Sequence, residues 1–269
     1  MTGREDSRER DEIIAGRHPV LEALRAGREI HKIWIAEGVQ RALIQPIEAE
    51  ARRRGIVMQT VDRRKLDQLA QGIAHQGVAA QAAAHRYAEL DELLAAAEAK
   101  GEPPLLLLLD EIEDPHNLGS ILRTAECAGA HGVVIPKRRS AGLTAAVYKA
   151  SAGAAEFVPV ARVTNLAQTI DRLKAHGLWI AGADAAARDD VYRADLTLPL
   201  AIVIGSEGRG IGRLIRDKCD FLVRLPMFGR INSLNASVAA GVLLYEAVRQ
   251  RAAAGSAPGS AAPVREPGG

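Results

Sequence analysis

The stretch PLLLLLDEI, residues 104–112, decides the fold class of this chain. Its five consecutive leucines leave no polar face, so the strand that they predict must be covered by side chains on both faces. Sheets covered in this way are mainly parallel and lie between layers of helices. The sequence continues in the same manner to about residue 251, because short apolar runs alternate with helical patterns. We therefore predict that residues 104–251 form an α/β domain with a mainly parallel sheet.

Hydrophobic periodicity, glycine and proline predict the other elements of this domain. The expected strands after the first are residues 131–136, 157–163, 178–184, 200–208 and 221–227. The expected helices are residues 117–130, 144–157, 166–177 and 210–220, and a last helix ends near residue 250.

A smaller α/β domain is predicted for residues 13–85. Its expected helices are residues 16–27, 42–55 and 63–72, with a break or kink near Pro46, and its expected strands are residues 30–38, 56–62 and 77–83. Residues 86–103 are predicted to be a linker that contains a helix. The charged residues 1–12 predict a disordered N-terminus, and residues 252–269, rich in Ala, Gly, Pro and Ser, predict a flexible tail.

Composition argues against several classes of protein. The 269 residues carry a formal net charge of +2 and only 3% aromatic residues, so charge alone indicates no nucleic acid and few rings could stack on bases. Cys127 and Cys219 lie far apart, which argues against a disulfide framework or a zinc site and predicts two small buried residues. The longest fully apolar run, residues 105–109, is too short to cross a bilayer, and the charged N-terminus is not a secretory signal. We therefore expect a cytoplasmic protein without a membrane partner.

Polar stretches follow three of the predicted strands, at the edge where open α/β sheets bind ligands. The first contains Asn117, Gly119 and Arg123. The second, IVIGSEGRGIG at 202–212, places Glu207 among glycines, but Arg213 breaks the GxGxxG spacing and no P-loop lysine follows. The third precedes the last helix with more small polar groups than one N-cap requires, namely Asn232, Ser233, Asn235 and Ser237.

The ordered set of these motifs is more specific than any one of them. N-L-G-x-x-x-R, then I-G-x-E-G-x-G-I, then S-L-N-x-S resembles the SpoU (TrmH-like) branch of the SPOUT methyltransferases, which are S-adenosylmethionine-dependent RNA ribose 2′-O-methyltransferases. GRHPVLEAL and HQGVAA resemble the N-terminal RNA-binding domain of that family, whose fold is similar to small ribosomal RNA-binding proteins. Within the branch, DPHNLGSILRTAECAG and SLNASVAAGVLLYEAVRQR are most similar to the bacterial enzymes that methylate a guanosine of large-subunit ribosomal RNA.

The resemblance implies a trefoil-knotted catalytic domain. The knot would comprise the loops around Gly205–Gly210 and Leu225–Asn235 and would bind S-adenosylmethionine. The positions that match the donor-binding pattern are Gly205, Leu225, Leu234 and Ala183. The positions that match the catalytic pattern are Arg123, Asn117, Glu207, Ser233 and Asn235, and no metal ion is needed.

The resemblance also implies roles and partners. Because a guanidinium almost never loses its proton, we expect Arg123 to bind the adjacent phosphate and orient the ribose 2′-hydroxyl. The family works as a homodimer, in which the partner subunit would donate Arg123, and the expected RNA partner is ribosomal. Basic runs at Arg52–Arg54 and Lys137–Arg139 are candidate phosphate contacts, and Phe228 and Arg230 stand where we expect smaller residues beside the acceptor.

Two other functions stay open. A transfer RNA ribose 2′-O-methyltransferase would use the same chemistry on another substrate. A non-catalytic RNA-binding protein, such as a ribosome assembly factor, would not need Arg123, Glu207 and Asn235 together and would not bind the methyl donor. A dehydrogenase is disfavoured by the glycine spacing.

Overall fold

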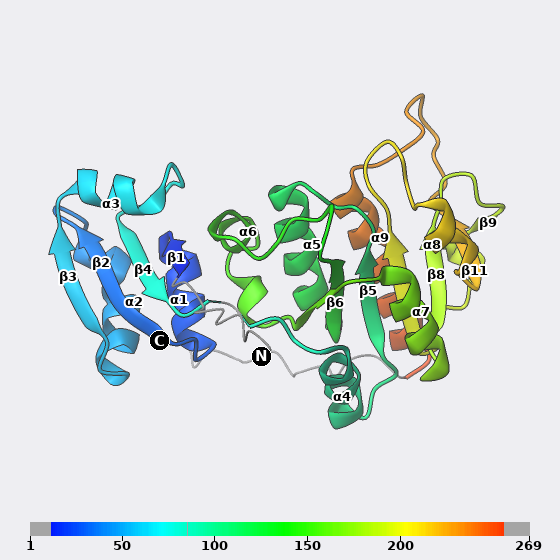
Figure 1. Cartoon of the computed structure of the whole chain (residues 1–269), viewed down its shortest axis with the longest axis horizontal. Helices are drawn as coiled ribbons and strands as arrows, with labels where there is room; N and C mark the ends of the chain where they lie inside the picture. The colour runs from blue at the N-terminus through cyan, green and yellow to red at the C-terminus, as the bar shows by residue number, and fades with distance from the viewer. Residues whose placement is uncertain (1–11, 85, 256–269) are drawn as a thin grey trace, which may run out of the picture. The chain divides into compact units, whose positions relative to one another are not determined.

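The computed structural model describes residues 12–84 and 86–255, which divide into two compact units (Figure 1). One unit takes in the chain up to Arg86 together with Leu118–Arg123 and Ala141–Phe157, and the other takes in the rest. The sequence predicts a disordered N-terminus for residues 1–12 and a flexible tail for residues 252–269, and of these, residues 1–11 and 256–269 lie outside the described residues. The predictions are wrong where Glu12 begins a strand and where the last helix continues to Ala253. The predicted domain boundaries stay a prediction.

A parallel sheet forms the centre of the larger unit, as the leucine run predicts. Within the described residues it has seven strands in the order β7-β6-β5-β10-β8-β11-β9, and every paired neighbour runs parallel. Each leucine of β5 has 0% of its surface exposed, so the prediction that both faces are covered is confirmed. The strands are β5 (Leu105–Leu109), β6 (Gly132–Pro136), β7 (Val160–Val163), β8 (Trp179–Ala183), β9 (Asp189–Asp190), β10 (Leu200–Ile204) and β11 (Phe221–Arg224).

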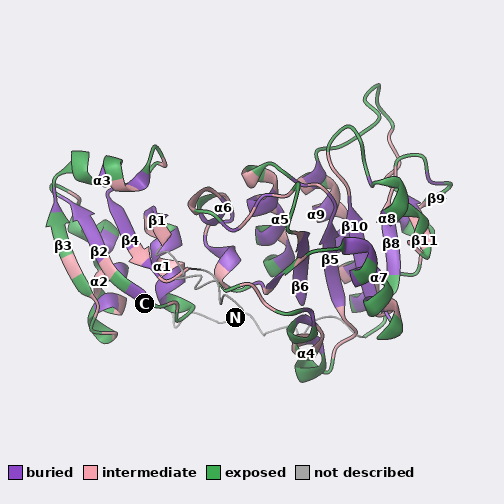
Figure 2. Cartoon of the chain, in the orientation of Figure 1, coloured by how far each residue is buried: buried purple, intermediate pink, exposed green. Residues whose placement is uncertain are grey.

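Several helices of the larger unit bury apolar side chains against this sheet, whereas α6 belongs to the other unit. The buried Ile170 and Leu173 of α7 lie in one core cluster with Leu106 of β5 and Val203 of β10. The strands are correspondingly buried and the outer helix faces exposed in Figure 2. The helices described after residue 86 are α4 (Leu90–Lys100), α5 (Pro115–Cys127), α6 (Ala145–Ala150), α7 (Leu166–Ala175), α8 (Arg213–Asp217) and α9 (Ala236–Ala253).

One buried arginine anchors the end of α9 to the start of the sheet. Arg251 is only 1% exposed, and its guanidinium donates hydrogen bonds at 2.6–2.8 Å to the carbonyl oxygens of Pro103, Pro104 and Leu198. Burial lowers the pKa of Arg251 to about 10, so the side chain still carries its charge at neutral pH. These bonds hold α9 beside the strands whose far ends carry the polar loops.

The smaller sheet has the order β1-β4-β2-β3. β2 and β3 are parallel, whereas β4 runs antiparallel to both of its neighbours. α2 continues through Pro46, so the predicted break is wrong, whereas the alternative of a kink at that residue stays a prediction. β1 was not predicted. The elements are β1 (Glu12–Ala15), α1 (Arg17–Arg25), β2 (Ile30–Ala36), α2 (Arg41–Arg53), β3 (Val57–Val61), α3 (Arg63–Ala70) and β4 (Val78–Ala82).

Two further sequence predictions are wrong in part. The helix predicted for residues 144–157 ends at Ala150, because Ala152 (φ 52°) and Gly153 (φ 92°) adopt left-handed conformations before a short 3-10 turn. Cys219 is partly buried against the core, but Cys127 is exposed on α5. None of the described helices has the length and apolarity needed to span a membrane.

Candidate active site

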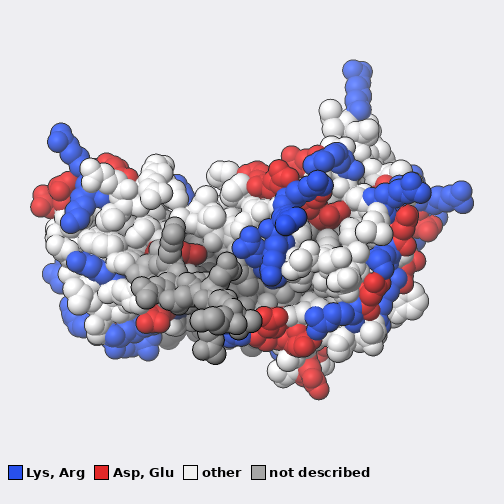
Figure 3. Space-filling view, viewed as in Figure 1, with Lys and Arg blue, Asp and Glu red and all other residues white. Residues whose placement is uncertain are grey.

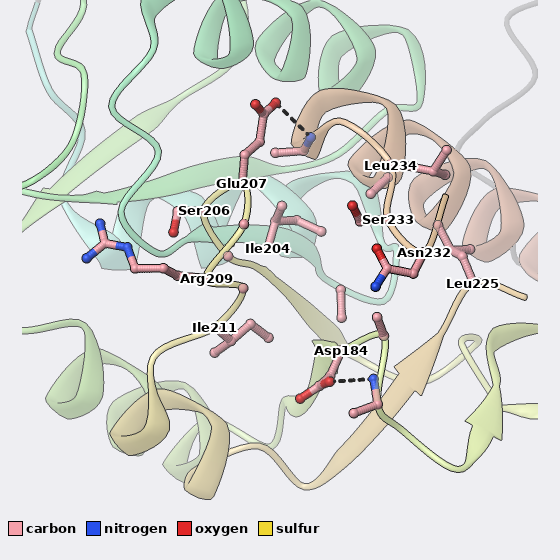
Figure 4. A pocket seen from close by; sticks show the side chains of 18 of the residues that line it. Asp184, Ile204, Ser206, Glu207, Arg209, Ile211, Leu225, Asn232, Ser233 and Leu234 are labelled. Atoms are coloured by element: carbon pink, nitrogen blue, oxygen red, sulfur yellow. Dashed lines mark hydrogen bonds between the residues drawn. The ribbon is translucent and has the colours of Figure 1, made fainter. Parts of the chain in front are cut away.

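A cavity of about 460 Å³ opens at the carboxyl ends of three neighbouring strands (Figure 4). Its walls come from the segments that follow β8, β10 and β11, and from the first turns of α9. This is the edge at which an open parallel sheet binds ligands, since each strand delivers a loop to the same side. Its lining includes the apolar side chains of Ile204, Val223 and Leu243 and the loop residues 205–210.

The structure brings the four predicted donor-binding residues together. Ala183, Gly205, Leu225 and Leu234 all line the cavity, although they come from different parts of the sequence. Position 205 has no room for a side chain, because a Cβ atom there would lie 2.1 Å from the carbonyl carbon of Gly210. These loops are also those predicted to form the trefoil knot, which stays a prediction, as do the donor contacts.

Three of the five predicted catalytic residues form one hydrogen-bonded group. Asn117 Nδ2 donates to Glu207 Oε1 at 3.0 Å, and Asn235 Nδ2 donates both to Asn117 Oδ1 at 2.9 Å and to Glu207 Oε1. The backbone N–H of Ala236 also donates to Glu207 Oε1, at 3.3 Å. The carboxylate therefore lies at the N-terminus of α9, where a negative charge is favoured. The group joins the start of α5, the loop after β10 and the start of α9.

Asn235 has two functions at the start of α9. Its Oδ1 accepts hydrogen bonds from the backbone N–H groups of Ser237 at 2.9 Å and Val238 at 3.3 Å, and from the Ser237 hydroxyl at 2.6 Å. Its Nδ2 is directed to Glu207 and Asn117 instead. Two of the surplus polar groups before the last helix are thereby explained, because one asparagine caps the helix and also joins the polar group.

Changing Asn235 to aspartate separates these two functions. The aspartate keeps the acceptor for the cap but loses the donor and places a second carboxylate against Glu207. We expect methyl transfer or ligand binding at this site to fall about 10- to 100-fold, as when a hydrogen bond to a charged group is lost, with little change in helix stability. Turnover and thermal melting of the purified variant measure the two effects.

Asn165 provides the matched control for this substitution. It caps α7 through a hydrogen bond from the Gln168 backbone N–H at 3.1 Å and lies in no such polar group. Asn165→Asp should therefore leave both turnover and melting nearly unchanged. Equal losses of turnover in Asn235→Asp and Asn165→Asp would show that Asn235 matters only as a helix cap.

Ser233 and Arg123 are not part of this polar group. Ser233 lines the cavity from the exposed loop before α9. Arg123 is exposed on α5 and is absent from the lining of the cavity. Six residues of helix separate it from Asn117, which turns the two side chains about 120° apart. Within the described residues the Arg123 guanidinium has no carboxylate partner, so it is available to another molecule.

A charged pair at the other side of the cavity was missed by sequence reasoning. Arg216 Nε lies 2.9 Å from Asp184 Oδ2, and both residues line the cavity. Asp184 Oδ1 accepts a hydrogen bond from the backbone N–H of Ala186 at 2.7 Å, as Figure 4 shows. Asp184 directly follows β8, so the rule that ligands bind at carboxyl ends of strands could have found it.

Asp110 holds the end of the loop after β10 in place. It directly follows β5 and is only 9% exposed, and its Oδ2 accepts a hydrogen bond from the Gly212 backbone N–H at 2.7 Å. Burial raises the pKa of Asp110, and the hydrogen bond from Gly212 opposes that rise. The loop that contributes Gly205 and Glu207 to the cavity is thus fixed at its far end.

Three of the candidate phosphate contacts, Arg53, Arg54 and Arg139, are engaged within the chain. Arg53 pairs with Glu50 at 2.7 Å, and Arg139 donates to Glu111 at 2.8 Å. Arg52 is exposed, but Arg54 donates hydrogen bonds to the carbonyl oxygens of Leu24, Gly27 and Arg28 at the end of α1. Arg54 therefore stabilises that turn of the smaller unit.

Comparison with known proteins finds a family model for each of the two main parts of the chain. The family model "SpoU rRNA Methylase family" matches residues 104–245, and "RNA 2'-O ribose methyltransferase substrate binding" matches residues 13–88. YacO of Bacillus subtilis (strain 168), described as a TrmH family tRNA/rRNA methyltransferase, is 56% identical over 91% of this chain and 98% of its own length.

Solved structures share the same architecture. The SpoU methyltransferase AviRb from Streptomyces viridochromogenes, in complex with the cofactor AdoMet, is 27% identical with a TM-score of 0.78 and covers 93% of this chain and 94% of its own. The A. aeolicus TrmH/SpoU tRNA modifying enzyme is 28% identical with a TM-score of 0.53, and the match covers 62% of this chain and 87% of its own.

Proposed function

Because the chain belongs to the SpoU family of RNA methyltransferases, we propose that it methylates the ribose 2′-hydroxyl of a guanosine in large-subunit ribosomal RNA, in the cytoplasm. That it is an S-adenosylmethionine-dependent RNA methyltransferase follows from the family and from its AdoMet-bound structural neighbours. The observation that carries the proposal is the cavity in which the predicted donor residues lie together with Glu207, whose carboxylate is hydrogen-bonded to Asn117 and Asn235.

The residues of the cavity fit S-adenosylmethionine. A volume of about 460 Å³ is typical of sites for small cofactors. Apolar walls from Ile204, Leu225 and Leu243 suit an adenine ring, and loop backbone beside Gly205 can satisfy its polar edge. The pair Asp184 and Arg216 offers both signs of charge to the zwitterionic amino-acid end. When bound, the donor supplies an electrophilic methyl group on a sulfonium.

The polar residues then have to orient the ribose and accommodate its proton. A 2′-hydroxyl is a poor nucleophile until its proton leaves, so close orientation carries much of the catalysis. Arg123 would bind the adjacent phosphate and align the hydroxyl, while Ser233 and Asn235 would hold the acceptor ribose. Glu207 would position Asn235 and the loop after β10, since its carboxylate accepts hydrogen bonds from both sides of the entrance. The proton would leave to a phosphate oxygen or to water.

The substrate-binding domain favours ribosomal RNA over transfer RNA. The model for substrate binding matches residues 13–88, which make up most of the smaller unit. The tRNA modifying enzyme matches only 62% of this chain, so a large part of this chain has no counterpart there. An additional RNA-binding domain suits a folded ribosomal RNA segment, whose recognition depends on shape and on phosphate contacts.

We further propose that the chain forms a homodimer through α9. The first half of this helix, residues 236–245, is largely apolar: Leu243 and Leu244 are buried, whereas Val238 and Tyr245 are each 50% exposed. An exposed apolar face on such a stretch is normally covered by another surface. Phe228 in the preceding loop is a further exposed apolar side chain, 96% exposed, and it does not line the cavity. A second copy of the chain would cover this surface.

Tyr245→Asp is expected to convert the dimer to a monomer. A carboxylate buried in an apolar contact without a partner is costly, so the interface would not form. Sedimentation equilibrium measures the mass. Val57→Asp is the control, because Val57 is 64% exposed on β3, far along the chain from α9, and this variant should stay dimeric. A monomeric unmodified protein, or a dimeric Tyr245→Asp variant, would contradict the proposal.

Methyl transfer to defined RNAs tests the proposed function. The chain is titrated with S-adenosylmethionine by calorimetry and then incubated with labelled donor and unmodified transcripts of large-subunit ribosomal RNA and of transfer RNA. We expect donor binding and label in a single 2′-O-methylguanosine of the ribosomal transcript. Label only in transfer RNA would keep the chemistry and change the substrate, whereas no donor binding at all would favour the RNA-binding assembly factor.

A further inference from the structure

Three charged side chains meet above the edge of the sheet that carries the cavity. Glu111 Oε1 accepts a hydrogen bond from Arg139 Nη1 at 2.8 Å, and Glu111 Oε2 lies 3.1 Å from Arg209 Nη2. Glu111 follows β5, Arg139 follows β6 and Arg209 follows β10, and these strands are neighbours in the order β6-β5-β10. We call these three residues the arginine fork.

The two guanidinium groups remain open to solvent. The side chains of Arg139 and Arg209 are each 71% exposed, whereas that of Glu111 is 24% exposed. Each guanidinium carries five N–H donors, of which the contacts to Glu111 use one. Within the fork one carboxylate balances two arginines, so these three residues together carry a net positive charge; the carboxylates of Glu113 and Asp110 also act on Arg139 and Arg209, respectively. Figure 3 shows Lys and Arg side chains gathered in a band on the face of the unit that holds this sheet.

The fork is not explained by its contribution to stability. The backbone of Glu111 (φ 57°) and of Arg139 (φ 55°) is left-handed, which costs about 1 kcal/mol or more for each residue that is not glycine. Exposed ion pairs contribute only about 0–1 kcal/mol. The hydrogen bond from Arg139 lowers the pKa of Glu111, so the carboxylate stays charged and holds both partners at neutral pH. Two strained residues at the two ends of one exposed ion pair therefore indicate a binding function.

We propose that Glu111 holds Arg139 and Arg209 apart as a fork that binds a backbone phosphate of the RNA substrate at the entrance of the methyl-donor cavity. This inference rests on the proposed function and adds to it a phosphate site and a positioning residue. Arg209 lines the cavity while Arg139 does not, so the fork extends from the donor site toward the outer surface. Guanidinium groups bind phosphate through two parallel hydrogen bonds, which fixes the strand as well as attracting it.

Salt dependence tests the two arginines. RNA binding of Arg139→Gln, Arg209→Gln and the double variant is measured at several salt concentrations with the two transcripts named above. Each single substitution should weaken binding and reduce the salt slope by about one, because one phosphate contact is lost. The double variant should lose less RNA-binding free energy than the two single variants lose together, because both arginines bind the same phosphate. Arg213→Gln is the control, since Arg213 is 95% exposed on α8 and outside the fork, and its slope should not change.

Glu111→Gln tests whether Glu111 positions the arginines, because the net-charge effect predicts a gain in RNA binding whereas the loss of positioning predicts a fall in turnover. Removing a negative charge beside RNA should strengthen binding if only net charge matters. If Glu111 positions the arginines, turnover should fall about tenfold while RNA affinity stays equal or rises, and Glu111→Asp should restore part of the turnover.

Several further results would overturn the arginine fork or the proposed function. Normal turnover of Glu111→Gln, or salt slopes equal to that of the unmodified chain for both arginine variants, would overturn the fork. So would Arg209→Gln if it weakened donor binding in calorimetry and left RNA binding intact, because the anion bound would then be the donor carboxylate. Failure of the unmodified chain to methylate any RNA would remove the proposed function, and the salt slopes would still be measurable.

Discussion

Gly205→Ala is expected to abolish binding of S-adenosylmethionine. The added Cβ atom would lie 2.1 Å from the carbonyl carbon and 2.3 Å from the carbonyl oxygen of Gly210, and 2.2 Å from the backbone nitrogen of Ile211. These are main-chain atoms of the loop that closes the cavity, and that loop is fixed at its end by Asp110. Overpacking of about 3 kcal/mol corresponds to at least ~100-fold in donor affinity. Calorimetric titration with the donor measures the loss.

Gly229→Ala is the control for this change. Gly229 lies in the loop before α9, and a Cβ atom added there would meet nothing within 4 Å, so this variant should bind the donor normally. Thermal melting of both variants separates a collapsed cavity from a chain that does not fold. A folded Gly205→Ala protein with normal donor affinity would exclude this cavity as the donor site.

Arg123→Lys is expected to reduce methyl transfer about 10²- to 10³-fold while donor affinity stays unchanged. Lysine keeps the charge but replaces the planar fork with a point charge, so it attracts a phosphate without fixing its orientation. Arg123 lies outside the cavity lining, so donor binding should not depend on it. Single-turnover kinetics with saturating donor measures the transfer step. Near-normal turnover with unchanged RNA affinity would exclude the orienting role.

Mixed dimers test whether Arg123 acts on the site of the partner subunit. Arg123→Ala chains and Gly205→Ala chains should each be inactive alone. If the active site takes its cavity from one chain and its arginine from the other, random mixing restores about a quarter of the activity, because half of the dimers are mixed and each has one intact site. No recovery on mixing would place Arg123 in the site of its own chain.

Several features were predictable because they depend on neighbouring residues. The short leucine run predicts a strand covered on both faces, and β5 has that environment. Gly205, Glu207 and Asn235 were identified from short motifs at the ends of predicted strands, and parallel strands bring such ends to one edge. By contrast, β1 is four residues long and gains its identity only by pairing with β4, so periodicity could not detect it.

The arginine fork and the double use of Asn235 depend on contacts between distant residues. Glu111 and Arg209 are far apart in sequence but meet because β5 and β10 are neighbours in the sheet. Asn235 donates to Glu207 only because the loop after β10 closes over the start of α9. Arg54 shows the converse, since it lies in a basic run typical of RNA binding, yet its donors are engaged by backbone carbonyls.

The sequence by itself determined the local conformations, the parallel sheet and the chemical types at the site, because these follow from the pattern of apolar and polar residues along a few turns or strands. Only the tertiary structure decided which of those polar groups share a hydrogen bond, which arginines remain open to a ligand and where α6 stops. The order of the strands in space depends on how much apolar surface the whole sheet buries, and no local stretch of the chain determines that total.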